Sequence, residues 1–345
     1  MYNSTMAIQP LPLPVQTLYA DLAQKLANPP SPPPGSISVK TVKGKKYLYV
    51  ARIEGGKQKQ ASLGPADDPA VLERAAAIKR EAGLARERRH TIAMLKRAGL
   101  QGPGTFAGPV LEALARAGLF DNGLVLVGTV AFQIYPALLG YRLPETSLMT
   151  QDADFVAASA SVSMAVERDE SAIEDDFQKG SGLLSLLQRV DATFRGAPQP
   201  GRAAFPSRFV SRSGFDVELL TPIRKRAEPN PVPLPALGAG AIPFHYLEFL
   251  VEGSIKAVAL YGSGVRLTVP RPARFAVHKL IVAHNREAGS VAKRQKDLRQ
   301  ASILFEVLDR AAPDEVGDAL DDARRRGRKW QRAINASLRT LGIEG

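Results

Sequence analysis

The sequence predicts an α+β fold in which a small basic N-terminal module precedes a mixed central domain and a mainly helical C-terminal domain. Residues 37–65 alternate apolar and polar side chains around Gly55-Gly56, which is typical of a β-hairpin. In the central part, a short apolar strand runs into a glycine turn and a helix, and a later strand begins with paired aspartates. Beyond two strand-like runs, residues 243–345 carry apolar side chains at helical spacing.

Composition bounds the class of protein. The chain has 345 residues, enough for two or three domains, and its 45% apolar content fits a globular protein. No apolar run approaches the roughly 20 residues that cross a bilayer, and the N-terminus lacks the order of a signal peptide. We therefore expect a cytoplasmic protein without membrane association. The absence of cysteine excludes disulfides and thiolate chemistry.

The positive charge of the chain is unevenly distributed. The formal net charge is +12, and residues 37–100 hold 15 Lys/Arg against 6 Asp/Glu, so 15 − 6 = +9 lies in that stretch. A local excess of this kind favours a polyanionic partner, although solubility alone would also account for it.

Composition shifts divide the chain into four parts. Residues 1–36 contain PLPLP and NPPSPPPGS, which predict a proline-rich flexible tail with a short helix within it. Residues 37–100 combine the hairpin with a helix from Pro69 to about Leu100, for which Asp67 and Asp68 are candidate caps. The hairpin resembles small basic sheet modules found beside integrases and transposases, and a plain structural hairpin is the alternative. Residues 106–242 carry the candidate chemistry.

Paired carboxylates mark the centre of this third part. Leu124–Val127 predicts a strand, followed by a turn at Gly128-Thr129 and a helix that continues to Leu139. Asp152 and Asp154 then share one face of a second strand, where their charges repel unless a cation lies between them. A polar strand start with both carboxylates in water is the alternative.

A second acidic pair follows on a later strand. The segment RFVSRSGFDVELLTP predicts a hairpin that turns at Gly214 and places Asp216 and Glu218 on one face. Spacing does not choose between these two carboxylates.

The order strand, glycine turn, helix, DxD strand and later acidic strand resembles the nucleotidyltransferase superfamily that includes DNA polymerase beta. The sequence is more similar to the bacterial branch that includes toxin-type enzymes of the abortive-infection class. The motifs that carry this resemblance are Val127-Gly128-Thr129-Val130-Ala131, Gly140-Tyr141-Arg142 and Asp152-Ala153-Asp154-Phe155. The resemblance spans roughly residues 124–308, and the loop between Arg142 and Asp152 is longer than is usual in that branch.

The resemblance implies a polymerase-beta-like mixed sheet with flanking helices and a two-metal site for Mg²⁺ or Mn²⁺. The implied metal and catalytic residues are Asp152, Asp154, and Asp216 or Glu218. The implied nucleotide-binding residues are Gly128, Thr129, Arg142, Lys279 and Lys296. Lys279 lies within an apolar helix and Lys296 at a charged helix start, so core packing and a solvated helix end are the alternatives.

The implied function is metal-dependent transfer of an NMP from an NTP to an acceptor hydroxyl. The acceptor could be a tRNA end, another RNA, a protein hydroxyl or a small molecule, and the basic module favours RNA. The alternative is a catalytically inactive nucleotidyltransferase fold that binds nucleic acid. Whether the protein is a toxin, which NTP it takes and its oligomeric state stay open.

Overall fold

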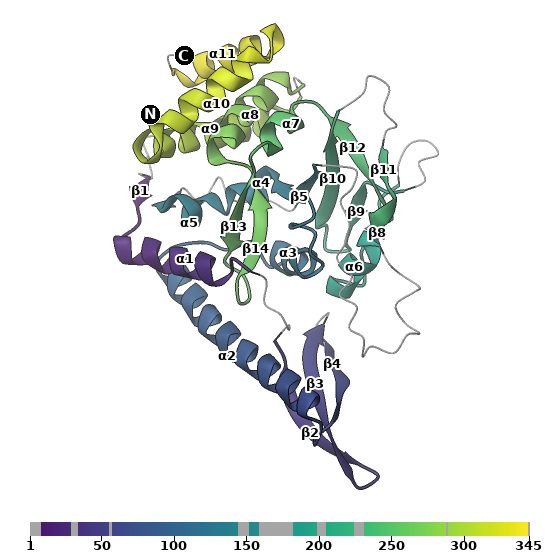
Figure 1. The fold of residues 1–345 in the computed structure, drawn as a ribbon. Helices are drawn as coiled ribbons and strands as arrows, with labels where there is room; N and C mark the ends of the chain where they lie inside the picture. Colours follow the sequence, from purple (N-terminus) through teal and green to yellow (C-terminus); the bar gives the residue numbers. More distant parts are fainter. Residues whose placement is uncertain are drawn as a thin grey trace.

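The computed structural model describes residues 8–28, 34–54, 57–143, 152–158, 182–198, 205–223, 231–287 and 289–343. It is an α+β protein with a mixed central sheet and helices packed around it (Figure 1). Within the described residues, the sheet has the order β11–β12–β10–β7–β5, and β9 and β8 extend it beside β10. The strands are β5 (Leu124–Val127), β7 (Asp152–Ala157), β8 (Arg195–Gly196), β9 (Arg208–Val210), β10 (Asp216–Pro222), β11 (Val232–Leu234) and β12 (Ala239–Phe244).

Strand β10 is the centre of this sheet because three strands pair with it. It runs parallel to β7 along one edge. On its other edge, its first half pairs antiparallel with β9 and its last residues pair parallel with β12. The predicted β9–β10 hairpin is confirmed, and Gly214 occupies its turn with φ +82°, which favours glycine.

Helices complete the body around the sheet. The strand β5 leads directly into the short helices α4 (Gly128–Phe132) and α5 (Tyr135–Leu139), where we expected one continuous helix. Ala107–Arg116 forms α3 and Leu183–Val190 forms α6, and these two helices pack together. One hydrophobic cluster contains residues of the sheet, of these helices and of the C-terminal helices. Phe155, Phe209 and Phe275 are fully buried in it.

The C-terminal part is mainly helical, as predicted. It contains α7 (Leu247–Val251), α8 (Pro272–Asn285), α9 (Val291–Ala311), α10 (Pro313–Arg325) and α11 (Arg328–Leu341). The expected strands β13 (Ile255–Ala259) and β14 (Val265–Val269) form an antiparallel pair. The turn between them holds Gly262 at φ +55° and Gly264 at φ +96°, so YGSG is a strand connection here.

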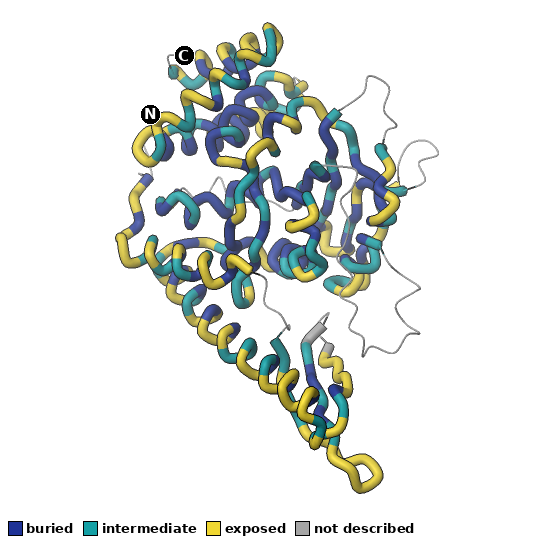
Figure 2. Tube along the Cα trace, viewed as in Figure 1, coloured by how far each residue is buried: buried dark blue, intermediate teal, exposed yellow. Residues whose placement is uncertain are grey.

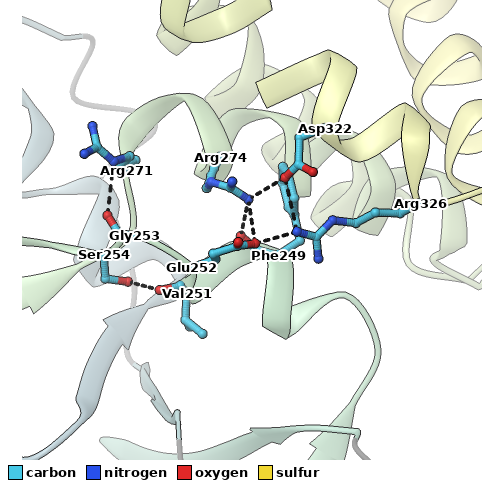
Figure 3. Close-up of polar contacts among 9 residues, drawn as sticks. All are labelled: Phe249, Val251, Glu252, Gly253, Ser254, Arg271, Arg274, Asp322 and Arg326. Atoms are coloured by element: carbon cyan, nitrogen blue, oxygen red, sulfur yellow. Dashed lines mark hydrogen bonds and ion pairs between the residues drawn. The ribbon is translucent and has the colours of Figure 1, made fainter. Parts of the chain in front are cut away.

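Ion pairs tie the end of α7 to α8 and α10. Arg274 lies between Glu252 and Asp322, and Arg326 contacts the same two carboxylates (Figure 3). Arg274 also lies over the Phe249 ring at 4.7 Å. This network fixes the C-terminal helices against the end of the sheet layer.

The short helix expected within residues 1–36, at Val15–Ala27, is present, but residues 8–28 pack on the body, where we expected a flexible tail. Helix α1 (Leu13–Lys25) packs against the body, and β1 (Gln9–Pro10) pairs with β6 (Tyr141–Arg142). The Tyr19 hydroxyl donates to the Val258 carbonyl at 3.1 Å, and Leu22 is fully buried. The prolines flank this helix or occupy its first turn, where a missing N–H costs nothing.

The basic module is an arm built from three strands and one long helix. Strands β2 (Ser36–Val42), β3 (Lys45–Glu54) and β4 (Lys57–Pro65) form an antiparallel sheet, one strand more than the predicted hairpin. Helix α2 (Pro69–Arg97) is capped by Asp68, whose carboxylate accepts from the Ala70 N–H at 2.8 Å. The strands lie at the far end of α2, and the turn between β2 and β3 is exposed (Figure 2).

Helix α2 takes part in two hydrophobic clusters, one in the arm and one on the body. The first half of α2 packs against the arm sheet β2–β4 through Val71, Ala75 and Ile78. Its second half packs with α1 through Ile92 and Leu95. None of the described helices combines the length and apolarity needed to cross a bilayer.

Candidate active site

Four carboxylates lie on one face of the sheet at the starts of two neighbouring parallel strands. In the β7–β10 register, Asp152 pairs with Asp216 and Asp154 pairs with Glu218. Residues directly opposite in adjacent strands share a face, as do positions two apart in one strand. The intervening Ala153 is buried on the other face. The structure therefore gathers both acidic pairs of the sequence at one place.

The glycine turn lies against the second aspartate. Val127, the last residue of β5, pairs with Asp154, and Gly128 follows with φ +66°. A Cβ atom at position 128 would overlap Asp154 Oδ2. Only glycine meets both the backbone conformation and this close approach.

Crowding and burial change the protonation of two of the acids. Burial, with the charges of Asp152 and Glu218, raises the pKa of Asp154 to about 7, against the opposing effect of Lys279 and Lys293. Burial also raises the pKa of Glu218, where Arg208 opposes it and Asp152 adds to it. Perturbed carboxylates of this kind are typical of functional sites.

The two candidates for the third acid have different surroundings. Asp216 accepts from the Arg208 guanidinium of β9, whose Nε lies 3.1 Å from Asp216 Oδ2. Within the described part of the chain, neither Asp154 nor Glu218 accepts a hydrogen bond or forms an ion pair. Asp216 is thus held by an arginine, whereas Glu218 faces Asp154 with its oxygens uncommitted.

Helices α8 and α9 bring cations beside the acids. Buried Lys279 of α8 donates from Nζ to Asp297 Oδ1 at 2.6 Å, and Arg286 Nε donates to Asp297 Oδ2 at 2.6 Å. Asp297 is 2% exposed, so this carboxylate is buried between two cations. Lys279 still acts electrostatically on Asp154.

Two further lysines lie on the first turns of α9. Exposed Lys293 acts on both Asp154 and Glu218. Half-buried Lys296 interacts with Asp152 and Asp154, and burial lowers its pKa. Lys293, Lys296 and Asp297 share a helix face because positions three and four apart lie together.

A family model matches the part of the chain that contains these residues. The model described as Nucleotidyltransferase matches residues 105–325, well over half of the chain. The chain belongs to this nucleotidyltransferase family. A comparison with curated proteins gave no match. The nucleotidyltransferase is also similar to an antigenic nucleotidyltransferase-like protein from Paracoccidioides brasiliensis, at 15% identity over 68% of this chain and 95% of that chain, with a TM-score of 0.31.

The predicted nucleotide-binding residues of this nucleotidyltransferase do not all lie near the four carboxylates. Arg142 Nη2 donates to the Ala98 carbonyl at 2.8 Å, and its guanidinium packs over Gly99 at the end of α2. Thr129 is buried at the start of α4, next to Gly128. The structure therefore brings Gly128, Thr129 and the lysines to one region and gives Arg142 a different neighbour.

One cation of the nucleotidyltransferase site, Arg208, was not among the predicted residues. It pairs in register with Glu218 and binds Asp216. Counting back from the Gly214 turn would place Arg208 on the acidic face, so the hairpin carried a usable signal.

The donor set of the site fits a hard cation by its chemistry. Asp154 and Glu218 are buried, crowded carboxylates, and burial followed by the charges of neighbouring carboxylates raises the pKa of each. Oxygen ligands of this kind suit Mg²⁺ or Mn²⁺. Among the described residues, no three His, Asp or Glu side chains are already gathered into a coordinating group.

Proposed function

We propose that this nucleotidyltransferase is a metal-dependent enzyme that moves an NMP from an NTP to an acceptor hydroxyl. The observation that carries the proposal is the register of β7 and β10, which sets Asp154 beside Glu218 with Asp152 two residues away on the same face. Asp152, Asp154 and Glu218 would hold Mg²⁺ or Mn²⁺. Asp216 would instead position Arg208 beside them, because these two residues already form an ion pair.

Bound divalent cations would supply charge stabilisation to the attacking and leaving oxygens of an in-line displacement at the α-phosphate. The protein supplies the rest. One of these carboxylates would also accept the proton of the acceptor hydroxyl. Gly128 leaves room beside the Asp154 carboxylate for a ligand that a side chain would displace.

The cations around the acids would bind the triphosphate. Lys293 is exposed and acts on two of the acids, so it is placed to neutralise phosphate oxygens. Lys296 would assist from the same helix face. Lys279 forms an ion pair with Asp297, so it would act on the phosphates by its positive charge at a distance. The backbone at Gly128 and Thr129 would contact the phosphates directly. We retain no nucleotide contact for Arg142, because its guanidinium engages Ala98.

The acceptor class that we favour is RNA, including tRNA, because the basic arm provides a surface for a polyanion. Membership of the toxin-type branch stays a prediction from the GTVA and GYR motifs.

Thermal shift with Mg²⁺ and NTP tests the proposal. Ligands that bind only the folded protein raise its Tm, so NTP should stabilise the wild-type protein only when Mg²⁺ is present. Asp152→Asn with Glu218→Gln should abolish that shift and leave the metal-free Tm intact. Salt-sensitive RNA binding without any Mg²⁺-dependent nucleotide shift would instead support the inactive, nucleic-acid-binding alternative.

A further inference from the structure

The arm sheet has one face covered by α2 and one face that no described element covers. The buried residues of the hydrophobic cluster under the covered face are Leu48, Val50 and Leu63 of the arm sheet and Val71, Ala75 and Ile78 of α2. Alternation along β3 places Tyr47 and Tyr49 on the opposite face. Their partners in register, Lys40 and Ser38 on β2 and Ser62 on β4, lie on that face with them.

Contacts between side chains confirm the geometry of this open face. Lys40 Nζ lies 4.6 Å from the centre of the Tyr49 ring and 2.5 Å from Gln60 Oε1. One residue from each of the three strands therefore meets on the open face. Tyr47 and Tyr49 are both partly exposed, so part of each ring is accessible on this face.

Positive charge surrounds these two rings. Residues 36–65 contain 7 Lys/Arg and 1 acidic residue. Lys40, Lys43, Lys45 and Lys46 are exposed near the turn that joins β2 to β3 (Figure 2). A cationic surface with partly exposed aromatic rings matches the two needs of a single nucleic acid strand, which are phosphate neutralisation and base stacking.

We propose that the open face of β2–β4 binds single-stranded RNA, with Tyr47 and Tyr49 stacking on bases and Lys40 and Lys45 contacting phosphates. The exposed Gln60 and Ser62 side chains of β4, near Tyr49, can pair with 2′-hydroxyls and base edges, which is why we choose RNA over DNA. The sheet is anchored to the body because α2 ends in the core shared with α1. The proposal rests on the proposed function only in treating this RNA as the acceptor.

The experiment measures binding of a fluorescent single-stranded RNA 15-mer of mixed sequence to the full-length protein, without NTP, at several salt concentrations. Tyr47→Ser with Tyr49→Ser should weaken binding more than about tenfold, and the corresponding double Phe variant should bind like the wild type. Lys40→Gln with Lys45→Gln should lower the logarithmic salt slope by about 1.4, since each phosphate that is no longer neutralised removes about 0.7.

Lys79→Gln with Arg80→Gln is the matched control, since it removes the same charge from exposed positions on α2. It should change affinity less than about threefold if the sheet face is the site. Crosslinking of a 5-bromouridine RNA to the wild-type protein should label Tyr47 or Tyr49. This measurement needs no variant, so it tests the site even if the serine variant does not fold. Unchanged affinity in the serine variant, equal losses in the two charge variants, or crosslinks confined to other segments would overturn the proposal.

Two more comparisons separate the alternatives. A duplex of the same sequence should bind more weakly than the single strand, and single-stranded DNA more weakly than RNA. Equal binding of the DNA would overturn the choice of RNA. The Mg²⁺-dependent nucleotide shift should persist in the tyrosine variants, so failure of the RNA proposal and failure of the transferase proposal give different results.

Discussion

Glu218 of β10 lies directly beside Asp154 of β7, in register on one face of two parallel strands. Burial raises the pKa of both carboxylates, the charges of Asp152 and Glu218 add to the rise at Asp154, and the charges of Asp152 and Asp216 add to it at Glu218. In contrast, Asp216 is neutralised by Arg208. This difference is the reason that we propose Glu218 as the third metal ligand and Asp216 as a positioning residue.

The first prediction separates these two acids. Glu218→Gln should lower kcat by about a thousandfold or more, because a lost metal ligand removes transition-state charge stabilisation. Asp216→Asn should lower it only about tenfold, since it loosens Arg208 rather than a ligand. Steady-state kinetics with Mg²⁺ titration makes the measurement. A larger loss for Asp216→Asn would reverse the assignment.

A second prediction concerns the glycine turn. Gly128→Ala places a Cβ where Asp154 Oδ2 now lies, so the carboxylate must move. Gly214→Ala is the matched control, because it has φ +82° but nothing within 4 Å of its Cβ. Both variants should lose about 1–2 kcal/mol of stability from backbone strain. Only Gly128→Ala should also lose Mg²⁺-dependent nucleotide binding, as thermal shift would show; parallel behaviour of the two would contradict the close contact.

The third prediction is a pH dependence of stability in the metal-free protein. Asp154 has a pKa of about 7 in the folded state against an ordinary value of 3.8, so the folded protein binds more protons between those values. Its contribution to the free energy of unfolding therefore falls as pH rises from about 4 to about 7. Asp154→Asn removes this loss. At pH 8 the free energy of unfolding of the variant should be higher than that of the wild type, on the order of 1–4 kcal/mol. Near pH 4 the two free energies should be equal.

Urea unfolding in EDTA at pH 4, 6 and 8 measures that difference. Buried His278 has its pKa lowered to about 3 by desolvation, so its contribution changes with pH in the opposite direction. The His278 effect is present in both proteins, so it cancels when the free energy of unfolding of the wild type is subtracted from that of the Asp154→Asn variant. A difference that is independent of pH would show that Asp154 titrates normally.

The fourth prediction concerns the N-terminal helix. Leu22 is fully buried where α1 meets α2 and the body, whereas Leu13 of the same helix is 73% exposed. Leu22→Ala should cost about 2–5 kcal/mol, and Leu13→Ala should change little. Thermal unfolding of both variants checks this. Equal Tm values would mean that α1 behaves as the flexible tail that the prolines suggested.

Local patterns predicted much of the fold. The strand Leu124–Val127 and the Asp68 cap follow from the order of side chains in a few residues. The docking of α1 did not follow, because Leu22 and Tyr19 are buried by partners far away in sequence, such as Val258. Proline content is a local signal and carries no information about such contacts.

The site was predictable in composition but not in its pairings. Alternation placed Asp152 with Asp154 and Asp216 with Glu218, yet only the parallel register shows which acid lies beside which. The choice of Glu218 depends on Arg208 reaching Asp216, a contact between side chains that spacing alone does not fix. Lys279 likewise has a suitable position in the sequence and a different partner, Asp297, in the structure.

The central claim is tested most directly by following two labels of one NTP. The wild-type protein is incubated with Mg²⁺, total RNA and NTP labelled at either the α- or the γ-phosphate, beside the Asp152→Asn, Asp154→Asn double variant. The account predicts that the α-label enters the acceptor, that the γ-label leaves as pyrophosphate, and that the variant transfers neither. Transfer of the γ-label, or α-label transfer that survives in the variant, would contradict it.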